Sequence, residues 1–163
     1  MKKVAIIMGS DSDLPVAQKA VAKLRMLAVP YEVHVISAHR TPEEAKDFAT
    51  AARKRGIGVI IAIAGKAAHL GGVLASWTTL PVIGIPCGGD GLGGIDALLS
   101  TVQMPPGIPV ASMAVNGGEN AAIFACQILA LDDDGLSERL NADRQSMQEK
   151  VRDKNSKIEE MFN

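Results

Sequence analysis

The densest group of reactive side chains in the sequence follows its second apolar segment. Ser37, His39 and Arg40 place a hydroxyl, an imidazole and a guanidinium in one short stretch. Arginine presents a planar fork of N–H donors that suits a phosphate or carboxylate, and histidine is the side chain whose ordinary pKa lies nearest neutral pH. These residue types favour anion binding next to a proton transfer, although an isolated loop histidine is more often structural than catalytic.

A second polar segment, Gly9 to Asp13, follows the first apolar run. Gly9 permits close approach of the main chain, Ser10 and Ser12 carry hydroxyls, and the start of a helix offers free N–H groups to a phosphate. Asp13 would repel phosphate, but it could accept hydrogen bonds from ribose hydroxyls. Alternatively, Ser12 and Asp13 only cap the following helix. This segment alone leaves both interpretations open.

A third segment, Gly65 to Gly72, consists mainly of small residues and contains a second histidine, His69. Small side chains would let a flat ring lie against main-chain N–H groups. The local sequence by itself favours a structural role for His69 at the start of a helix, and His34 lies inside an expected strand. No histidine spacing typical of a metal site occurs, and no glycine motif for a dinucleotide or triphosphate is present. We therefore expect no metal site and no dinucleotide or triphosphate site.

The elements that position these segments alternate between short apolar runs and amphipathic stretches. Val4–Met8 is a wholly apolar run, as in a strand buried on both faces of a parallel sheet. Thr41, Pro42 and Glu44 predict a capping box that begins the second helix. The other expected strands are Tyr31–Ile36, Val59–Ala64, Pro81–Pro86 and Pro109–Val115, and the expected helices begin near Pro15, Pro42, His69, Asp96 and Glu119.

This order predicts an α/β fold, specifically a three-layer, flavodoxin-like (Rossmann-like) doubly wound parallel sheet of five strands. Such sheets bind ligands at the carboxyl ends of their strands. We therefore expect the segments after the first three strands to meet in one crevice.

The last part of the chain differs from the rest. Residues 1–131 should form the flavodoxin-like catalytic domain, and residues 132–163 a charged helical extension. Leu140, Met147 and Val151 belong to an apolar stripe on this extension. We expect the stripe to pack on the domain or on a neighbouring subunit.

Composition excludes several classes of partner. The formal net charge is −1 and aromatic residues make up 3% of the chain, so a nucleic-acid partner is not expected. The apolar stretches are too short or too interrupted for a membrane span or a secretion signal. Cys87 and Cys126 form no disulfide-type pattern, which suits a reducing, cytoplasmic compartment.

Four motifs together resemble the N5-carboxyaminoimidazole ribonucleotide mutase family (PurE), over almost the whole chain. They are Met8-Gly9-Ser10-Asp11-Ser12-Asp13, Ser37-Ala38-His39-Arg40-Thr41-Pro42, Ala67-Ala68-His69-Leu70 and Val102-Gln103-Met104-Pro105. The resemblance implies a homo-octameric enzyme of purine (IMP) biosynthesis. Such an enzyme isomerises its small ribonucleotide substrate to the C4-carboxylated product, with no cofactor or metal.

The resemblance also implies roles for particular residues. His39 would carry the proton, with His69 as the second catalytic histidine. Ser10, Ser12, Ser37 and Arg40 would hold the phosphate and Asp13 the ribose. The loop from Gly65 through His69 to Leu70 would cradle the migrating carboxyl group. The full expected substrate-binding set is Gly9, Ser10, Ser12, Asp13, Ser37, Ala38, Arg40, Gly65, Lys66, Ala67, Ala68 and Leu70.

Two positions depart from the usual family loop: Lys66 replaces a glycine and Gly71 replaces a proline. A basic residue near position 66 is typical of the related enzymes that carboxylate aminoimidazole ribonucleotide directly with carbon dioxide. Direct carboxylation is therefore the alternative activity.

The alternative outside enzymes is a flavodoxin-like nucleotide-binding module, since the same fold serves many functions. A flavin carrier fits poorly because Tyr31 and Trp77 fall within a strand and a helix. A phospho-receiver fits poorly because Ala64 and Gly65, not an aspartate, end the third strand.

Overall fold

The structure, a computed structural model, describes residues 1–89 and 91–162. Asp90 and Asn163, which belong to the ranges 1–131 and 132–163 expected from the sequence, lie outside the described residues. The strands are β1 (Lys3–Met8), β2 (Tyr31–Val35), β3 (Ile57–Gly65), β4 (Val82–Cys87) and β5 (Ala111–Ser112). The α-helices are α1 (Leu14–Met26), α2 (Pro42–Ala52), α3 (Leu70–Ser76), α4 (Ile95–Val102), α5 (Gly118–Leu129) and α6 (Asp134–Phe162).

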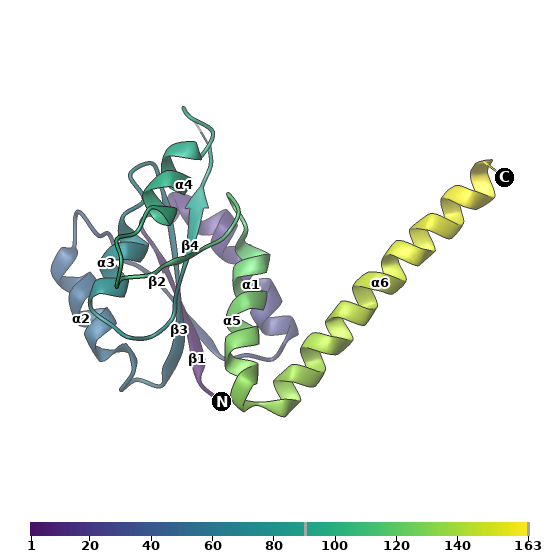
Figure 1. Ribbon diagram of the computed structural model, residues 1–163, viewed down its shortest axis with the longest axis horizontal. Helices are drawn as coiled ribbons and strands as arrows, with labels where there is room; N and C mark the ends of the chain where they lie inside the picture. The colour runs from purple at the N-terminus through teal and green to yellow at the C-terminus, as the bar shows by residue number, and fades with distance from the viewer. Residues whose placement is uncertain (90, 163) are drawn as a thin grey trace.

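The five strands form one parallel sheet in the order β2-β1-β3-β4-β5, with helices on both faces (Figure 1). Helices α1 and α5 cover one face, while α2, α3 and α4 cover the other. The predicted flavodoxin-like α/β fold is therefore confirmed. In this order β1 lies between β2 and β3, so the loops that follow these three strands leave the same edge of the sheet side by side.

The core is aliphatic because the central strands contribute side chains to both faces. Along β1, Ile6 packs with the α1 and α5 side and Ile7 packs with the α2 and α3 side. Alternation along a strand produces this division. Each face buries its own apolar cluster, and the sheet is fixed between them.

The fifth strand is much shorter than the predicted Pro109–Val115, since only Ala111 and Ser112 pair with β4. Pro109 has no N–H to donate to a strand ladder. Asn116 takes a left-handed conformation with φ of 58°, which no extended strand residue adopts. The prediction was right in place and wrong in length.

The first turns of α6 pack against the rest of the subunit. Leu136 is fully buried, and Arg139 Nε donates to the Leu27 carbonyl oxygen at 2.8 Å. Lys23 Nζ lies 3.1 Å from Asp143 on α6 and 2.9 Å from Glu119 on α5. Burial opposes the charged form of Lys23, but these two carboxylates raise the pKa of Lys23 above its ordinary value.

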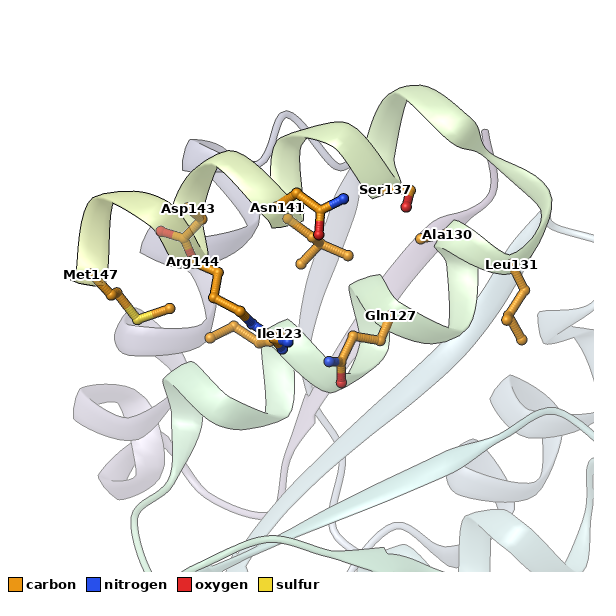
Figure 2. A pocket seen from close by; sticks show the side chains of 10 residues that line it. Ile123, Gln127, Ala130, Leu131, Ser137, Asn141, Asp143, Arg144 and Met147 are labelled. Atoms are coloured by element: carbon orange, nitrogen blue, oxygen red, sulfur yellow. The ribbon is translucent and has the colours of Figure 1, made fainter. Parts of the chain in front are cut away.

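Beyond this contact α6 projects away from the domain (Figure 1). A groove of about 240 Å³ lies in the angle between α5 and α6, where Arg144 extends toward Ile123 and Gln127 (Figure 2). Past this groove the helix is exposed from Gln148 to Phe162. The apolar stripe predicted from the sequence therefore has a proximal part that packs and a distal part that faces solvent.

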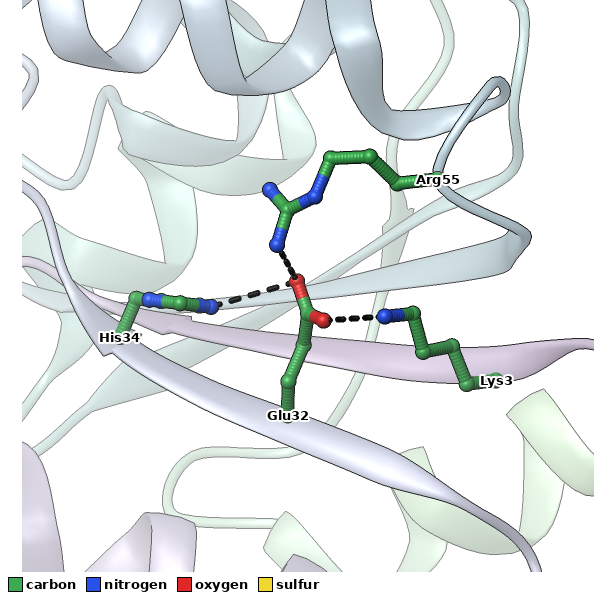
Figure 3. A network of polar contacts seen from close by, with 4 residues as sticks. All are labelled: Lys3, Glu32, His34 and Arg55. Carbon is green, nitrogen blue, oxygen red and sulfur yellow. Dashed lines mark hydrogen bonds and ion pairs between the residues drawn. The ribbon is translucent and has the colours of Figure 1, made fainter.

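An ionic network joins the neighbouring strands β1 and β2 to the turn after α2 (Figure 3). Glu32 accepts from Lys3 Nζ at 2.6 Å and from Arg55 Nη2 at 2.6 Å, and His34 Nε2 lies 3.2 Å from it. Burial alone would raise the pKa of Glu32. The hydrogen bond from Lys3 and the nearby charge of Arg55 outweigh burial, so the pKa lies below its ordinary value of 4.5.

We expect Glu32→Gln to lower the free energy of unfolding at pH 7 by about 1–3 kcal/mol, because charge-assisted hydrogen bonds are lost in a site only 17% exposed. A carboxyl group with a lowered folded pKa stabilises the protein above its unfolded pKa, and the stabilisation disappears as the pH falls through the folded pKa. The difference between wild type and variant should therefore shrink below pH 4.5, as measured by denaturant unfolding.

Glu43→Gln is the matched control, since Glu43 is 84% exposed and lies 3.9 Å from Lys46. It should leave stability nearly unchanged. A loss from Glu32→Gln that persisted equally at low pH would contradict the electrostatic explanation.

Candidate functional site

Three loops at the carboxyl edge of the sheet enclose a cavity of about 490 Å³. The structure brings together almost all of the residues singled out from the sequence. Those that line the cavity are Gly9, Ser10, Ser12, Asp13, Ser37, Ala38, His39, Arg40, Gly65, Lys66, Ala67, His69 and Leu70. Ala68 is different, because it is 2% exposed and is not part of the lining. The cavity volume lies within the range of about 300–1,000 Å³ typical of small-molecule sites.

The first loop is held in shape by its own polar groups. Ser10 Oγ accepts from the amide of Ser12 at 3.3 Å, and Asp13 Oδ2 accepts from the amide of Ser10 at 3.2 Å. This reciprocal capping box starts a short 3-10 turn, Asp11–Asp13, that leads into α1. The sequence suggested that Ser12 and Asp13 cap the helix. In the structure, Ser10 and Asp13 make the cap. All three side chains nevertheless border the cavity.

Asp13 is buried, and its carboxyl group is next to the thiol of Cys87 at the end of β4. Burial raises the pKa of Asp13, opposed by hydrogen bonds from Cys87 and from the amides of Ser10 and Gly9. Burial, together with the negative charge of Asp13, raises the pKa of Cys87 to about 12. The thiol is therefore protonated at neutral pH and donates its hydrogen to Asp13.

The second loop, from Ser37 to Thr41, is closed by Thr41. Thr41 Oγ1 accepts from the amide of Ser37 at 3.0 Å and donates to the Ser37 carbonyl oxygen at 3.2 Å. Thr41 is the N-cap residue and Pro42 the first residue of α2, as predicted, but the predicted capping box with Glu44 is wrong. The threonine hydroxyl bonds back across the loop, so it closes the turn that displays His39 and Arg40.

Arg40 joins the first two loops. Its Nη2 donates to the Gly9 carbonyl oxygen at 3.1 Å, and its Nε donates to Ser37 Oγ at 3.4 Å. Arg40 is exposed, and a guanidinium has five N–H donors. It can therefore keep these contacts and still offer donors to an anion in the cavity.

His39 and His69 are in direct contact. Nε2 of His39 lies 2.9 Å from Nδ1 of His69, and the two rings meet edge to face at 86°. A hydrogen bond between two imidazoles needs one N–H donor and one bare nitrogen. The pair therefore connects the second and third loops through a bond that can carry a proton, at the border of the cavity.

The third loop turns sharply at Lys66, which has a left-handed conformation with φ of 55°. This region suits glycine, and a residue with a Cβ pays about 1–2 kcal/mol to occupy it. The chain then makes two tight hydrogen bonds, from the Ala68 amide to Lys66 and from the His69 amide to Ala67. The conformation explains the glycine of the usual family loop, and it also places a lysine in the cavity wall.

Sequence reasoning missed two features of this region. Ala64, the residue before Gly65, also lines the cavity, and its position at the end of β3 was the available signal. Cys87 lies on β4, and it borders a neighbouring cavity of about 460 Å³ that shares Ser12, Asp13, Gly65 and Lys66 with the first. Nothing in the sequence near Cys87 points to Asp13, because the two residues meet only through the sheet.

Within residues 1–89 and 91–162, no cluster of three or more histidine, cysteine, aspartate or glutamate side chains is placed to hold a metal ion. In the same part of the chain, no helix combines the length and hydropathy needed to cross a membrane.

Residues 3–150 match the family described as AIR carboxylase. The chain is 52% identical to the N5-carboxyaminoimidazole ribonucleotide mutase of Pyrococcus horikoshii, over 97% of this chain and 89% of that protein. It is also 52% identical to the mutase of Methanocaldococcus jannaschii, over 98% of this chain and 99% of that protein. Both relatives span nearly the full length of the chain.

The fold is similar to that of a solved structure, the crystal structure of Treponema denticola PurE. The two superpose with a TM-score of 0.85 at 28% identity, over 95% of this chain and 97% of that one. The likeness therefore extends from the sheet into α6.

Proposed function

The chain belongs to the AIR carboxylase family, and we propose that it converts N5-carboxyaminoimidazole ribonucleotide to 4-carboxy-5-aminoimidazole ribonucleotide in purine biosynthesis. The observation that carries the proposal is the contact of His39 with His69 on the wall of a cavity that also receives Arg40 and the Ser10 loop. One cavity thus combines an anion-binding side and a proton-carrying side.

The substrate phosphate would bind between the first two loops. Ser10, Ser12 and Ser37 offer hydroxyl groups there, and Arg40 offers a positive charge fixed by its bonds to Gly9 and Ser37. Asp13 accepts from the main chain and from Cys87, and its remaining oxygen lone pairs would accept the ribose hydroxyls. This arrangement directs the imidazole ring of the substrate toward the third loop.

The reaction would then proceed in two stages at the third loop. The carbamate loses carbon dioxide, and His39 gives a proton to the nitrogen that is released. The ring C4 next attacks the retained carbon dioxide, and His39 takes the C4 proton, which restores both the aromatic ring and the histidine. Holding carbon dioxide against C4 can supply up to about 7–11 kcal/mol through proximity, and proton transfer by a positioned base contributes about 10²–10⁴-fold.

Direct carboxylation of aminoimidazole ribonucleotide is the second candidate, and Lys66 favours it. This exposed lysine is one of the residues that line the cavity, within the loop proposed to hold the carboxyl group. A cation there would attract bicarbonate or a carboxylate as well as stabilise the product.

An assay with two substrates tests the proposed function. The purified protein receives the carbamate substrate in one arm and the decarboxylated ribonucleotide with bicarbonate in the other, and the C4-carboxylated product is measured. We expect faster turnover of the carbamate, and Lys66→Gly should increase this preference. Product formed only from the second arm would identify a carboxylase, and product in neither arm would reject both activities.

We also propose that the enzyme works as a homo-octamer in the cytoplasm. Helix α4 exposes an apolar face that includes Ile95, Leu99 and Val102. The distal half of α6 exposes Val151 and Ile158. Exposed apolar surfaces of this kind are typical of contacts between subunits. The exposed stripe of α6 is a helix face that could dock on another subunit. The groove between α5 and α6 (Figure 2) is a place where such a helix could bind.

We expect Val151→Asp to weaken the assembly, because it places a charge on an apolar residue that is 65% exposed in the single subunit. Analytical ultracentrifugation should show smaller species at concentrations where the wild type is octameric. Ser156→Asp adds the same charge to a different side of the helix and should leave the assembly intact. Equal sedimentation of all three proteins would contradict a role for α6 in assembly.

A further inference from the structure

A large groove lies at the edge of the sheet opposite the candidate site, where the strands begin. It has a volume of about 950 Å³ and is bordered by the end of α2, the turn between α3 and β4, and residues 107–109. We call it the Trp77 groove. Its lining shares no residue with the cavity that holds His39 and Arg40. Any ligand bound here would be separate from the proposed reaction.

The Trp77 groove carries positive charge that its surroundings do not neutralise. Lys46, Arg53 and Lys54 line it, and no carboxylate is part of the lining among the described residues. Lys46 forms an ion pair with Glu43 at 3.9 Å, and Glu43 is highly exposed. Arg53 and Lys54 form no ion pair within the part of the chain that the structure describes. A small anion would therefore find several uncompensated cations along one wall.

One of these cations is held in place. Arg53 Nη2 donates to Thr79 Oγ1 at 3.0 Å, which ties the end of α2 to the turn before β4. This contact uses one of the five guanidinium donors. The others are available for a phosphate group, and Lys54 follows directly in the chain.

Trp77 supplies a flat apolar surface beside these charges. It is the single tryptophan of the sequence, and its side chain is 47% exposed while it lines the groove. Lys46 Nζ lies 5.0 Å from the centre of the ring. Leu80 and Ile108 add aliphatic surface to the same lining. Half-exposed aromatic rings next to arginine and lysine are the combination that stacks nucleobases and binds their phosphates.

A simpler explanation accounts for only part of this arrangement. Cations near the end of a helix stabilise its dipole, which would explain Arg53 and Lys54. It explains neither Lys46, one turn after the start of α2, nor the exposed ring of Trp77. The groove also has the volume of a small-molecule site.

We propose that the Trp77 groove binds a nucleotide, with its base stacked on Trp77 and its phosphate held by Arg53 and Lys54. Because the Trp77 groove and the candidate site share no lining residue, such a nucleotide would bind separately from the substrate.

Fluorescence of Trp77 gives a direct test on the full-length protein, because no other tryptophan contributes. AMP should change the fluorescence in a saturable manner. Adenosine and ribose 5-phosphate, which retain only the base or only the phosphate, should bind at least about ten-fold more weakly, since each lacks one kind of contact. Arg53→Ala combined with Lys54→Ala should weaken AMP binding by about ten-fold or more. Two control variants should bind AMP as the wild type does. One is Arg40→Ala, and the other combines Arg152→Ala with Lys154→Ala on α6.

Three results would overturn the proposal. The first is the absence of a saturable response to AMP, and the second is ribose 5-phosphate binding as tightly as AMP. The third is a result with the ligand-free protein, in which acrylamide quenches the fluorescence of Trp77 in Val151→Asp but not in the wild type. That result would make the groove a contact between copies of the chain.

Discussion

Replacing His39 with asparagine should reduce kcat by about 10²–10⁴-fold, the usual contribution of a positioned acid or base. Asparagine retains a polar side chain of similar size but cannot carry the proton between the substrate nitrogen and C4. The contact of His39 with His69 at 2.9 Å places the imidazole on the cavity wall, so its loss should not remove the anion-binding loops. Substrate affinity, measured by calorimetry, should change by less than the turnover does.

His34→Asn is the matched control for this prediction. His34 lies on β2 beside Glu32, away from the cavity lining. Turnover by this variant should stay close to that of the wild type. Near-normal turnover by His39→Asn would exclude His39 as the proton carrier. A fall in affinity as large as the fall in kcat would instead make it a binding residue.

Replacing Arg40 with alanine should weaken binding of the ribonucleotide by roughly 10–150-fold, since a hydrogen bond to a charged group contributes about 1.5–3 kcal/mol. The guanidinium bridges Gly9 and Ser37, the two loops that would enclose the phosphate. KM should rise more than kcat falls, because phosphate contacts act equally on the substrate and the transition state. Steady-state kinetics with the carbamate substrate separates the two effects.

A substrate lacking its phosphate provides the control for Arg40. If Arg40 acts through the phosphate, the alanine substitution should have little effect on binding of the corresponding nucleoside, which already binds weakly to the wild type. Arg40→Lys should fall between wild type and alanine, because lysine keeps the charge but loses the planar fork. An equal loss of affinity for nucleotide and nucleoside would show that Arg40 mainly supports the shape of the loops.

The proposed assembly and the proposed nucleotide binding can be tested independently of this chemistry. Val151 lies on the projecting half of α6, and Trp77 lies at the opposite edge of the sheet from His39. A variant with unchanged kcat and altered assembly or AMP binding would therefore separate the roles. The Glu32 network adds a stability effect that should be visible only above the folded pKa of that carboxyl group.

Much of the fold followed from local pattern. The uninterrupted apolar residues of β1 and the helical spacing of Val16, Ala20 and Leu24 depend only on neighbours along the chain. Because every strand is followed by a helix, the sheet had to be parallel, and parallel strands end at the same edge. The meeting of the three polar loops was therefore predictable from the order of the elements. The length of β5 was not, because it depends on pairing with β4.

By itself, the sequence determined the α/β architecture and which loops border the cavity, since both follow from periodicity and strand order. The tertiary structure alone decided which side chains touch. Neighbouring residues in the sequence do not determine that His39 contacts His69 or that the thiol of Cys87 lies beside Asp13. They also do not determine that Thr41 bonds to Ser37 instead of to Glu44. The first two contacts join residues far apart in the chain, so they arise only once the pairing of β2, β1, β3 and β4 brings their loops together. The Thr41 hydroxyl can bond to more than one nearby backbone group, and the packed loop selected Ser37.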